Sequence, residues 1–322
     1  MFYRDLESKY ANFIGTKDCI SVNTGTAALH VALEAMELEP GTKVIVPDFT
    51  MYASALAVYY ARLSPVFVDC DDDLLIDLDK AEKAIDEKTK VLMVTHVYGR
   101  TVDMNRVMKL AEKYGLRVIE DACEAQGASI GGKMIGSFDV GCFSFYSNKI
   151  IHGEEGGAVT TNDLDLASKI RDMKSMSFGD THDYYHERIG FNYRMTNSQA
   201  KLILESLSQV DKNLNGRERI KILFNSLFKK SFQMQDNRDV VWVYDMRHPR
   251  ADLVVKKLKN LNISARHSFK PMSIMPLFKS DLIGINSLKK SKEIFYLHIS
   301  PNWTKEEVYK IYKITQKILD ET

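Results

Sequence analysis

The sequence has few cysteines, no excess of charge of either sign and no long apolar run, and each of these absences excludes a class of protein. Its four cysteines, Cys19, Cys70, Cys123 and Cys142, form no CxxC or Cys/His cluster, so we expect no metal site. Scattered cysteines in a chain of 322 residues fit a reducing, cytoplasmic compartment. Basic and acidic residues number 44 and 43, which argues against nucleic acid or a membrane surface as a partner. No apolar run approaches the roughly 18 residues that cross a bilayer.

Short apolar segments alternate with helical patterns over the first half of the chain. The predicted strands are Lys43–Val46, Pro65–Val68, Lys90–Val94, Arg117–Ile119, Cys142–Phe145 and Ala158–Thr160. Strands that are apolar throughout and separated by helices indicate a sheet that is covered on both faces. The fold class is therefore α/β, with a large sheet that is mixed or mostly parallel and covered by helices.

Helical periodicity predicts the helices between these strands. The helical segments are Thr26–Met36, Met51–Ala61, Val102–Tyr114, Asp163–Met176 and a long stretch over Asn197–Leu227. Asp103 is a plausible N-cap of the third, and Gly115 a plausible residue just after its end. Residues 178–194 predict a long irregular loop. We assign residues 1–209 to a large α/β domain and residues 210–322 to a smaller C-terminal α+β domain.

The stretch NTGTAALHVAL, Asn23–Leu33, follows a short apolar segment and starts a helix. Gly25 permits a tight turn, Thr24 and Thr26 supply hydroxyl groups, and the new helix offers free N–H groups. This combination suits a bound phosphate. An ordinary helix capped by threonine would have the same sequence.

The stretch RVIEDACEAQGA, Arg117–Ala128, places Glu120 and Asp121 at the end of a predicted buried strand. Open α/β sheets bind ligands at such strand ends. A buried carboxylate there needs a cationic partner, and a protonated ring nitrogen of a cofactor would serve. A solvated acidic turn or a structural ion pair is the alternative. Glu124 and Gln126 extend the polar cluster.

The stretch SFYSNKIIHGEEGG, Ser144–Gly157, places Lys149 between an apolar strand and a glycine-rich turn. A lysine that is desolvated there has a lowered pKa and a nucleophilic amine. A single lysine is more often a solvated surface residue. Together, however, a phosphate cradle, a strand-end aspartate and this lysine are the groups that hold pyridoxal 5'-phosphate (PLP).

Several stretches resemble one known family, the DegT/DnrJ/EryC1/StrS nucleotide-sugar aminotransferases, which have the fold-type I (aspartate aminotransferase-like) architecture. The resemblance runs from about residue 7 to the C-terminus. It is carried by GTAALH (25–30), VIVPDFT (44–50), PVFVDCD (65–71), HVYG (96–99), EDACEAQGA (120–128), FSFYSNK (143–149) and IGFNYRMTNSQA (189–200). The last two stretches are most similar to the perosamine synthase-like branch, which acts on 4-keto-6-deoxy sugars.

The resemblance implies a role for individual residues. Lys149 takes the place of the lysine that forms the Schiff base, and Asp121 that of the partner of the pyridine nitrogen. Glu124 takes a position beside the cofactor ring. The implied phosphate contacts are Thr24, Gly25, Thr26 and Ser144, together with Asn192 from a second subunit. The resemblance therefore implies a homodimer with shared active sites.

Other positions depart from the family pattern or match it only as single residues. Met51 stands where relatives have an aromatic residue that stacks on the cofactor, and Tyr52 follows it. Glu154 replaces a glycine of the turn after the lysine. The implied substrate residues are Tyr52, His182, His186 and Arg266, although solvent exposure would also explain the histidines and the arginine. Trp242 and Trp303 are interpreted as packing residues.

The resemblance implies a transaminase with PLP as cofactor and pyridoxamine phosphate (PMP) as its aminated form. L-glutamate would donate the amino group, and the C4 ketone of a nucleotide-linked 4-keto-6-deoxy sugar would receive it. Lysine at position 149 indicates transamination, because related dehydratases have histidine there. One alternative is a ketone at C3 or on a sugar without a nucleotide. Another is a binding or regulatory homologue that has lost activity, which the change at Glu154 motivates.

Overall fold

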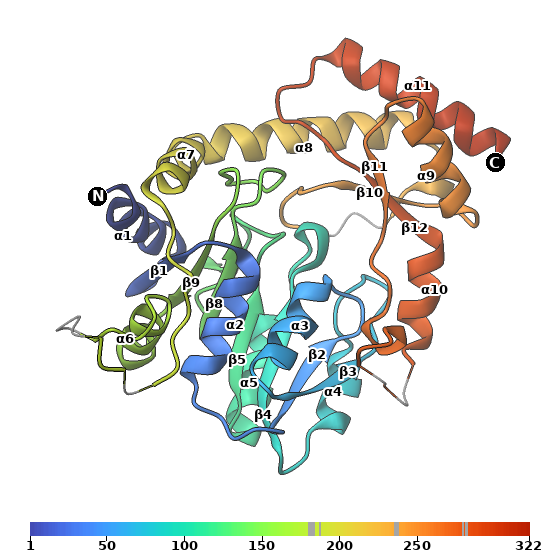
Figure 1. The fold of residues 1–322 in the computed structure, drawn as a ribbon. Helices are drawn as coiled ribbons and strands as arrows, with labels where there is room; N and C mark the ends of the chain where they lie inside the picture. The colour runs from blue at the N-terminus through green and yellow to red at the C-terminus, as the bar shows by residue number, and fades with distance from the viewer. Residues whose placement is uncertain (180–183, 187, 235–237, 279, 281–282) are drawn as a thin grey trace.

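The computed structural model describes residues 1–322 except residues 180–183, 187, 235–237, 279 and 281–282. A large sheet with helices on both faces makes up the N-terminal part, and a small sheet with three helices lies at the other end (Figure 1). Among the described residues, no helix is both long and apolar enough to span a membrane.

The large sheet has seven strands, in the order β1-β9-β8-β5-β4-β2-β3. Their bounds are β1 Asp18–Val22, β2 Lys43–Pro47, β3 Ser64–Val68, β4 Thr89–Thr95, β5 Arg117–Asp121, β8 Val140–Ser144 and β9 Gly157–Thr161. Strands β3, β2, β4, β5 and β8 pair in parallel, whereas β9 is antiparallel to both β8 and β1. The predicted α/β fold with a mixed, mostly parallel sheet is confirmed.

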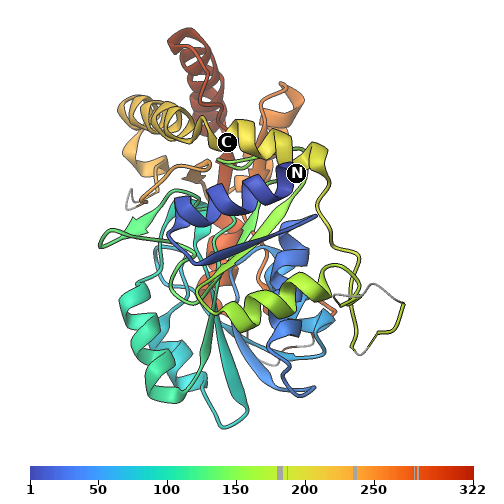
Figure 2. The same ribbon diagram turned by 90° about the vertical axis from the view of Figure 1, so that its left-hand side faces the viewer.

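Helices cover both faces of this sheet (Figures 1 and 2). They are α1 (Phe2–Ile14), α2 (Gly25–Ala35), α3 (Tyr52–Tyr60), α4 (Leu78–Ala84), α5 (Met104–Tyr114) and α6 (Leu164–Met173). Ile45 and Leu92 contribute to an apolar core with α1, α4 and α5, whereas their neighbours Val44 and Val91 contribute to a second core with α2, α3 and α6. Successive strand residues point to opposite faces, so strands with a core on each side must be apolar throughout.

The ends of α5 follow the local sequence signals. The Asp103 side chain accepts a hydrogen bond from the backbone N–H of Arg106, which satisfies a free donor of the first turn. Gly115 ends the helix in the left-handed conformation, at φ 65°, which glycine adopts without steric cost. The predicted caps of this helix are therefore confirmed.

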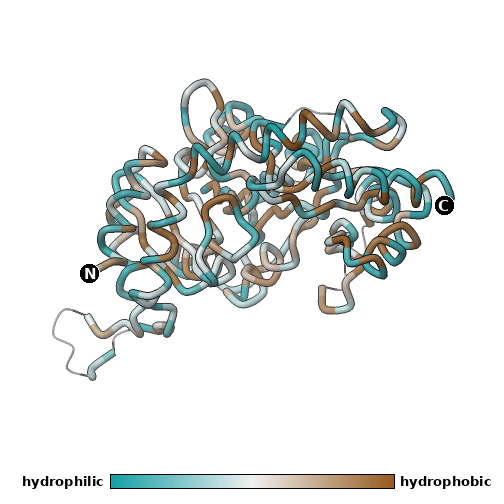
Figure 3. Tube along the Cα trace, turned by 90° about the horizontal axis from the view of Figure 1, so that it is seen from above, coloured by the Kyte–Doolittle hydropathy of each residue, from teal (hydrophilic) through white to brown (hydrophobic). Residues whose placement is uncertain are grey.

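The C-terminal part contains a three-stranded antiparallel sheet, in the order β10-β12-β11. Its strands are β10 (Tyr244–Arg247), β11 (Ala265–His267) and β12 (Ile294–Leu297), and its helices are α9 (Ala251–Asn260), α10 (Ile285–Glu293) and α11 (Lys305–Glu321). Seen from above, α11 alternates hydrophilic with hydrophobic residues along its length (Figure 3). Val308, Ile318 and Leu319 of α11 join a third apolar core.

Two helices, α7 (Asn197–Leu207) and α8 (Val210–Leu227), connect the two parts. The prediction of one helical stretch over this region was wrong at Ser208 and Gln209, which separate the two helices. The hydroxyl of Ser208 donates to the carbonyl of Glu205, a local bond that competes with continued helix. A domain boundary at 209/210 stays a proposal, and it coincides with the start of α8.

Short elements complete the described chain. They are a two-stranded hairpin of β6 (Ser129–Ile130) and β7 (Lys133–Met134), and 3₁₀ turns η1 (Val97–Gly99), η2 (Lys230–Phe232) and η3 (Met272–Ile274). The parallel strands end at one edge of the large sheet, where Asp121 and Ser144 are the last residues of β5 and β8. Open α/β sheets bind their ligands along this edge.

Candidate active site

The N-terminus of α2 and the end of β8 form a small polar cradle. Thr24 caps the helix, and its Oγ1 accepts a hydrogen bond of 3.1 Å from the N–H of Ala27. Gly25 packs directly on Ser144, because a Cβ at position 25 would lie 2.7 Å from the Cβ of Ser144. The N–H groups of Gly25 and Thr26 are in the first turn, so they have no acceptor within the helix. These donors and the helix dipole favour a bound anion such as phosphate.

Asp121 is a buried carboxylate at the end of β5. Its Oδ2 accepts a hydrogen bond of 2.7 Å from the hydroxyl of Ser54, and its Oδ1 accepts one of 3.3 Å from the N–H of Cys123. Ser54 is in turn held by Thr50, which contacts Thr95. Among the described residues, no cation forms an ion pair with Asp121. A buried carboxylate without a cation is expected to receive one from a ligand.

Glu120, the neighbour of Asp121, points to the opposite face of the sheet and has a structural role. Its carboxylate accepts hydrogen bonds of 2.9 Å from the N–H groups of Gly136 and Phe138, and it lies 3.4 Å from Nε2 of His96. Glu120 is therefore a structural acidic residue, whereas Asp121 has no ion-pair partner among the described residues. The two side chains differ because neighbouring residues of a strand point to opposite faces of the sheet.

Lys149 lies in the turn after β8 and is only 9% exposed, which excludes the interpretation as a solvated surface lysine. Its Nζ lies 3.8 Å from Oε1 of Glu124 and 4.0 Å from the ring centroid of Trp242. The buried amide of Gln126 holds the turn, since it donates to the carbonyl of Ser144 and accepts from the N–H of Ile151. The lysine amine is thereby kept between an acid and an aromatic face.

These groups fit PLP. The cradle provides donors for a phosphate, Asp121 provides a negative charge for a protonated pyridine nitrogen, and Lys149 provides the amine. The glycine at position 25 is required by the close packing on Ser144.

The family model described as the DegT/DnrJ/EryC1/StrS aminotransferase family matches residues 2–316. The chain belongs to this family. The GDP-perosamine synthase of Caulobacter vibrioides is 42% identical over 290 residues, which cover 85% of this chain and 78% of that protein. The UDP-N-acetyl-3-dehydro-alpha-D-glucosamine 3-aminotransferase of Acidithiobacillus ferrooxidans is 40% identical over 219 residues, which cover 67% of this chain and 59% of that protein.

Solved structures agree with this assignment. DesV of S. venezuelae, solved in complex with a ketimine intermediate, has a TM-score of 0.92 at 27% identity, covering 100% of this chain and 90% of that one. NtdA of Bacillus subtilis, solved with bound cofactor PMP, has a TM-score of 0.88 at 25% identity, covering 99% of this chain and 77% of that one. The chain is thus a PLP-dependent sugar aminotransferase of the DegT/DnrJ/EryC1/StrS family, with the predicted fold and cofactor.

In this family member, Glu124 is a buried acid beside the lysine. Burial raises the pKa of Glu124 to about 7, although the nearby Lys149 amine opposes the shift. Its Oε2 accepts a hydrogen bond of 3.1 Å from the N–H of Tyr98. Tyr98 has a left-handed conformation, with φ 55°, and Gly99 packs against the carbonyl of Val240 too closely for any Cβ. The HVYG motif therefore aims a backbone donor at Glu124.

Trp242 was missed as a site residue by the sequence analysis, which interpreted it as packing. Its Nε1 donates a hydrogen bond of 2.9 Å to the carbonyl of Asn148, the residue before the lysine. Its ring lies beside those of Tyr98 and Tyr296 and under the Lys149 amine. A run of apolar residues before β10 gave no signal of this contact, which bridges 94 positions of the chain.

Met51 and Tyr52 begin α3 at the edge of the site. Met51 is 51% exposed, whereas the ring of Tyr52 packs against Phe278, with centroids 5.7 Å apart. Their predicted contacts with the cofactor and the sugar stay predictions. Asn192 is exposed and forms an isolated β-bridge with Ser175, so its predicted role toward a second subunit also stays a prediction.

The predicted substrate residues lie in different surroundings. His182 lies outside the described residues. Nδ1 of His186 lies 2.9 Å from the carbonyl oxygen of Met176, and its ring packs on Phe178, so it is turned toward its own loop. Arg266 lies on β11 and lines a cavity on the other side of the lysine turn.

Glu154 does not strain the turn in which it replaces glycine. It is exposed and has no positive φ, whereas Gly156 has φ 153°, a conformation that L residues rarely adopt. Gly156, the position in this turn whose conformation requires glycine, is therefore still a glycine. The change at Glu154 gives no structural reason to infer a loss of activity.

Proposed function

We propose that this aminotransferase moves the amino group of L-glutamate to the C4 ketone of a nucleotide-linked 4-keto-6-deoxy sugar. The observation that carries the proposal is the buried amine of Lys149, held between Glu124 and Trp242. The similarity to the GDP-perosamine synthase over most of both chains supports the choice of sugar. When bound, PLP supplies an electron sink for the carbon that gains or loses a proton.

The residues of the chain then take distinct roles. Thr24, Gly25, Thr26 and Ser144 bind the phosphate and fix the position of the reacting carbon. Asp121 stabilises the protonated ring nitrogen by its charge. Lys149 first holds the cofactor covalently and, once released, moves the proton as general acid and base.

Glu124 and Trp242 act on Lys149 rather than on the substrate. Glu124, with a pKa of about 7, can hold or release a proton next to the amine near neutral pH. Trp242 covers the amine with an aromatic face, which stabilises its charged form. Asn192 of a second copy would complete the phosphate site, so we propose a homodimer with shared sites.

A second candidate is amination at C3, which the 40% identity to a 3-aminotransferase favours. To separate the two, the PLP-loaded protein is incubated with L-glutamate and either a nucleotide-linked 4-keto-6-deoxy sugar or a nucleotide-linked 3-keto sugar. NMR of the product identifies the aminated carbon. We expect an amine at C4; turnover of the 3-keto sugar alone would refute the proposed specificity.

A further inference from the structure

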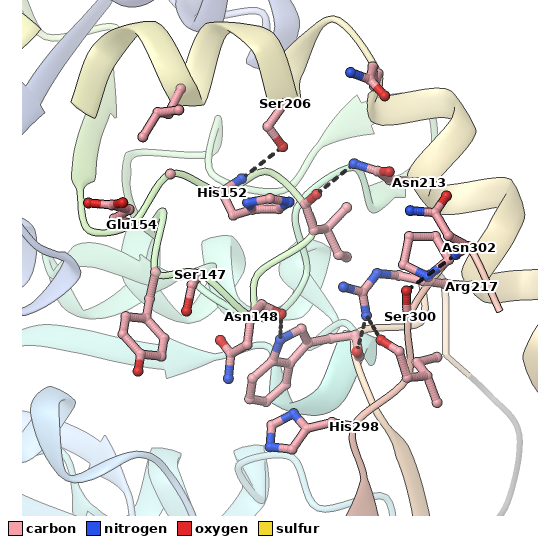
Figure 4. A pocket seen from close by; sticks show the side chains of 18 of the residues that line it. Ser147, Asn148, His152, Glu154, Ser206, Asn213, Arg217, His298, Ser300 and Asn302 are labelled. Atoms are coloured by element: carbon pink, nitrogen blue, oxygen red, sulfur yellow. Dashed lines mark hydrogen bonds between the residues drawn. The ribbon is translucent and has the colours of Figure 1, made fainter. Parts of the chain in front are cut away.

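A cavity of about 750 Å³ lies behind the turn that carries Lys149, between helices α7 and α8 and the small sheet (Figure 4). Its polar lining includes Asn148, His152, Asn213, Arg217, Arg266 and His298. Thr24, Asp121 and Ser144 do not line it, so the cavity is separate from the phosphate cradle. Trp242 forms part of its wall and also contacts the Lys149 amine, which connects the cavity to the reaction site.

Arg217 is a buried cation in the wall of this cavity, only 6% exposed. Its Nη1 donates to the carbonyl oxygens of Trp242, at 2.6 Å, and Ile299, at 3.3 Å. Within the described part of the chain, no carboxylate forms an ion pair with it. Burial lowers the pKa of Arg217 to about 10. These carbonyl groups satisfy Nη1, whereas the buried Nε has no hydrogen-bond partner in the described structure. The carbonyl groups also leave the charge of Arg217 without a counter-charge, which is costly in a buried position.

Two histidines that line the same cavity have lowered pKa values, in part because cations lie nearby. Burial and the cations of Arg266, Arg217 and Lys149 lower the pKa of His298 to about 4. Burial and Arg217 also lower the pKa of His152. The side chains of Arg217, His152 and His298 approach the cavity from different sides (Figure 4).

The acidic residues that line the cavity do not pair with Arg217, whereas Lys149 has Glu124 as its counter-charge. Glu154 and Glu205 are among its lining residues, but both are exposed. Neither contributes to the shifted pKa values of Arg217, His152 and His298. The neutral histidines, together with the amide groups of the lining, offer further hydrogen-bond donors to an anion.

We propose that this cavity binds an oxyanion-bearing small molecule, a carboxylate or a phosphate ester, through Arg217 and Arg266. The inference rests on the proposed function only for the identity of that molecule, because L-glutamate carries carboxylates and a nucleotide sugar carries phosphates. An anion in the cavity would offset the charge of Arg217 and would lie next to the Trp242 wall that contacts the catalytic lysine.

The test is isothermal titration calorimetry on the PLP-loaded protein at constant ionic strength. The probes are glutarate, which resembles the donor but cannot be transaminated, GDP, and inorganic sulfate. We expect at least one to bind, and Arg266→Gln to weaken that binding by about tenfold or more. Arg250→Gln, which removes another exposed arginine outside the lining of this cavity, should leave that binding unchanged. Binding of glutarate would indicate that the cavity takes the amino donor, and binding of GDP that it takes the acceptor. Binding of sulfate alone would indicate that it takes a free inorganic anion.

NMR titration of His298 gives a second readout. A bound anion should raise the pKa of His298 above its value of about 4 in the wild type, and less so in Arg266→Gln. The inference is overturned if none of the three probes binds, or if Arg266→Gln binds them as the wild type does. Neither measurement requires turnover. A protein that binds the anion but aminates no sugar would refute only the proposed function. A protein that aminates the sugar but binds none of the three probes would refute only this inference.

Discussion

Two buried carboxylates of this protein, Asp245 and Asp121, differ in what surrounds them. Burial alone would raise the pKa of Asp245, but the guanidinium groups of Arg100 and Arg238 hold it below its ordinary value. Both arginines lie 2.8 Å from its carboxylate oxygens. Asp121 is also buried, but its hydrogen-bond partners are the hydroxyl of Ser54 and the backbone N–H of Cys123. One charge is neutralised by two arginines, whereas the other has no cationic partner in the described part of the chain.

The comparison shows how a buried charge with a structural role differs from one that can bind a ligand. Asp245 lies on β10 and Arg100 follows the HVYG turn, so their ion pair joins the two parts of the chain. Asp121 and Arg217 instead have no ion-pair partner among the described residues, and Arg217 lines the cavity. Buried charges that lack a counter-charge in the chain cost stability and are expected at sites that bind ligands.

The largest effect is expected for Lys149→Ala. Turnover with L-glutamate and a keto sugar should be abolished, because neither the covalent attachment nor the proton transfer has another group to perform it. Initial rates measure the loss, and circular dichroism checks the fold. Lys201→Ala, an exposed lysine on α7, is the control and should keep full activity. A Lys149→Ala protein with wild-type rates would refute the assignment.

Asp245→Asn should cause the largest loss of stability among the charge variants. It removes the carboxylate charge that Arg100 and Arg238 share, and removing one partner of a buried ion pair costs about 3–5 kcal/mol. Urea unfolding at neutral pH measures the change. The control is Asp5→Asn in the exposed pair with Lys9, where little change is expected. Equal stabilities of the two variants would contradict the structural role of Asp245.

Glu124→Gln should change how stability depends on pH. The pKa of Glu124 is raised from 4.5 to about 7, so its contribution to stability is present below pH 4.5 and is lost as the pH rises through 7. Relative to the variant, the wild-type apoprotein should lose up to about 3 kcal/mol over this window. Urea unfolding of both proteins at several pH values tests this. A difference that is constant with pH would show that Glu124 does not titrate there.

Asp121→Asn should weaken the binding of PLP while leaving the apoprotein as stable as the wild type. The lost hydrogen bond between charged groups is worth about 1.5–3 kcal/mol, or about tenfold to more than a hundredfold in affinity. Equilibrium titration with PLP measures the affinity, and urea unfolding of the apoprotein measures its free energy of unfolding. If stability fell as in Asp245→Asn and affinity did not change, the contrast between the two aspartates would be wrong.

The smallest effect is expected for Trp242→Leu. Loss of the aromatic face over Lys149 removes a contact that stabilises the charged, unattached amine, so the equilibrium constant for attachment of PLP should rise by about twofold to thirtyfold, since cation–π contacts are worth about 0.5–2 kcal/mol. The absorbance of the lysine-bound cofactor measures it. Trp242→Phe, which keeps an aromatic ring, should show a smaller change than Trp242→Leu. Trp303→Leu is the control. An equal change in Trp303→Leu would show that Trp242 is only a packing residue.

The sequence was sufficient for the parts of the site that are local in the chain. Strands β2, β3, β4, β5, β8 and β9, the cap of α2 by Thr24 and the glycine turn after Lys149 follow from periodicity and from residue types whose preferences are strong, whereas β1, α1 and α4 were not predicted. Asp121 could be placed at a strand end for the same reason. Alternation along β5 then explains why Glu120, one position away, belongs to the other face.

The remaining parts depend on contacts between distant segments, which periodicity does not encode. Trp242 is an ordinary apolar position by pattern, and its contact with the lysine turn appears only when the C-terminal part packs on the large sheet. Arg217 lies on an amphipathic helix where an arginine is usually solvated, but in the structure it is buried and donates to the carbonyl of Ile299, in the segment after β12. The break between α7 and α8 was missed because both helices continue the same apolar pattern.

The most direct test of the central claim, that Lys149 is the residue that holds the cofactor, is reduction of the PLP-loaded protein with borohydride followed by peptide mass spectrometry. Borohydride fixes the carbon–nitrogen bond between the cofactor and its lysine. We predict one modified peptide, with the added mass on Lys149. Modification of a different lysine, or none in a protein that has bound PLP, would contradict the account.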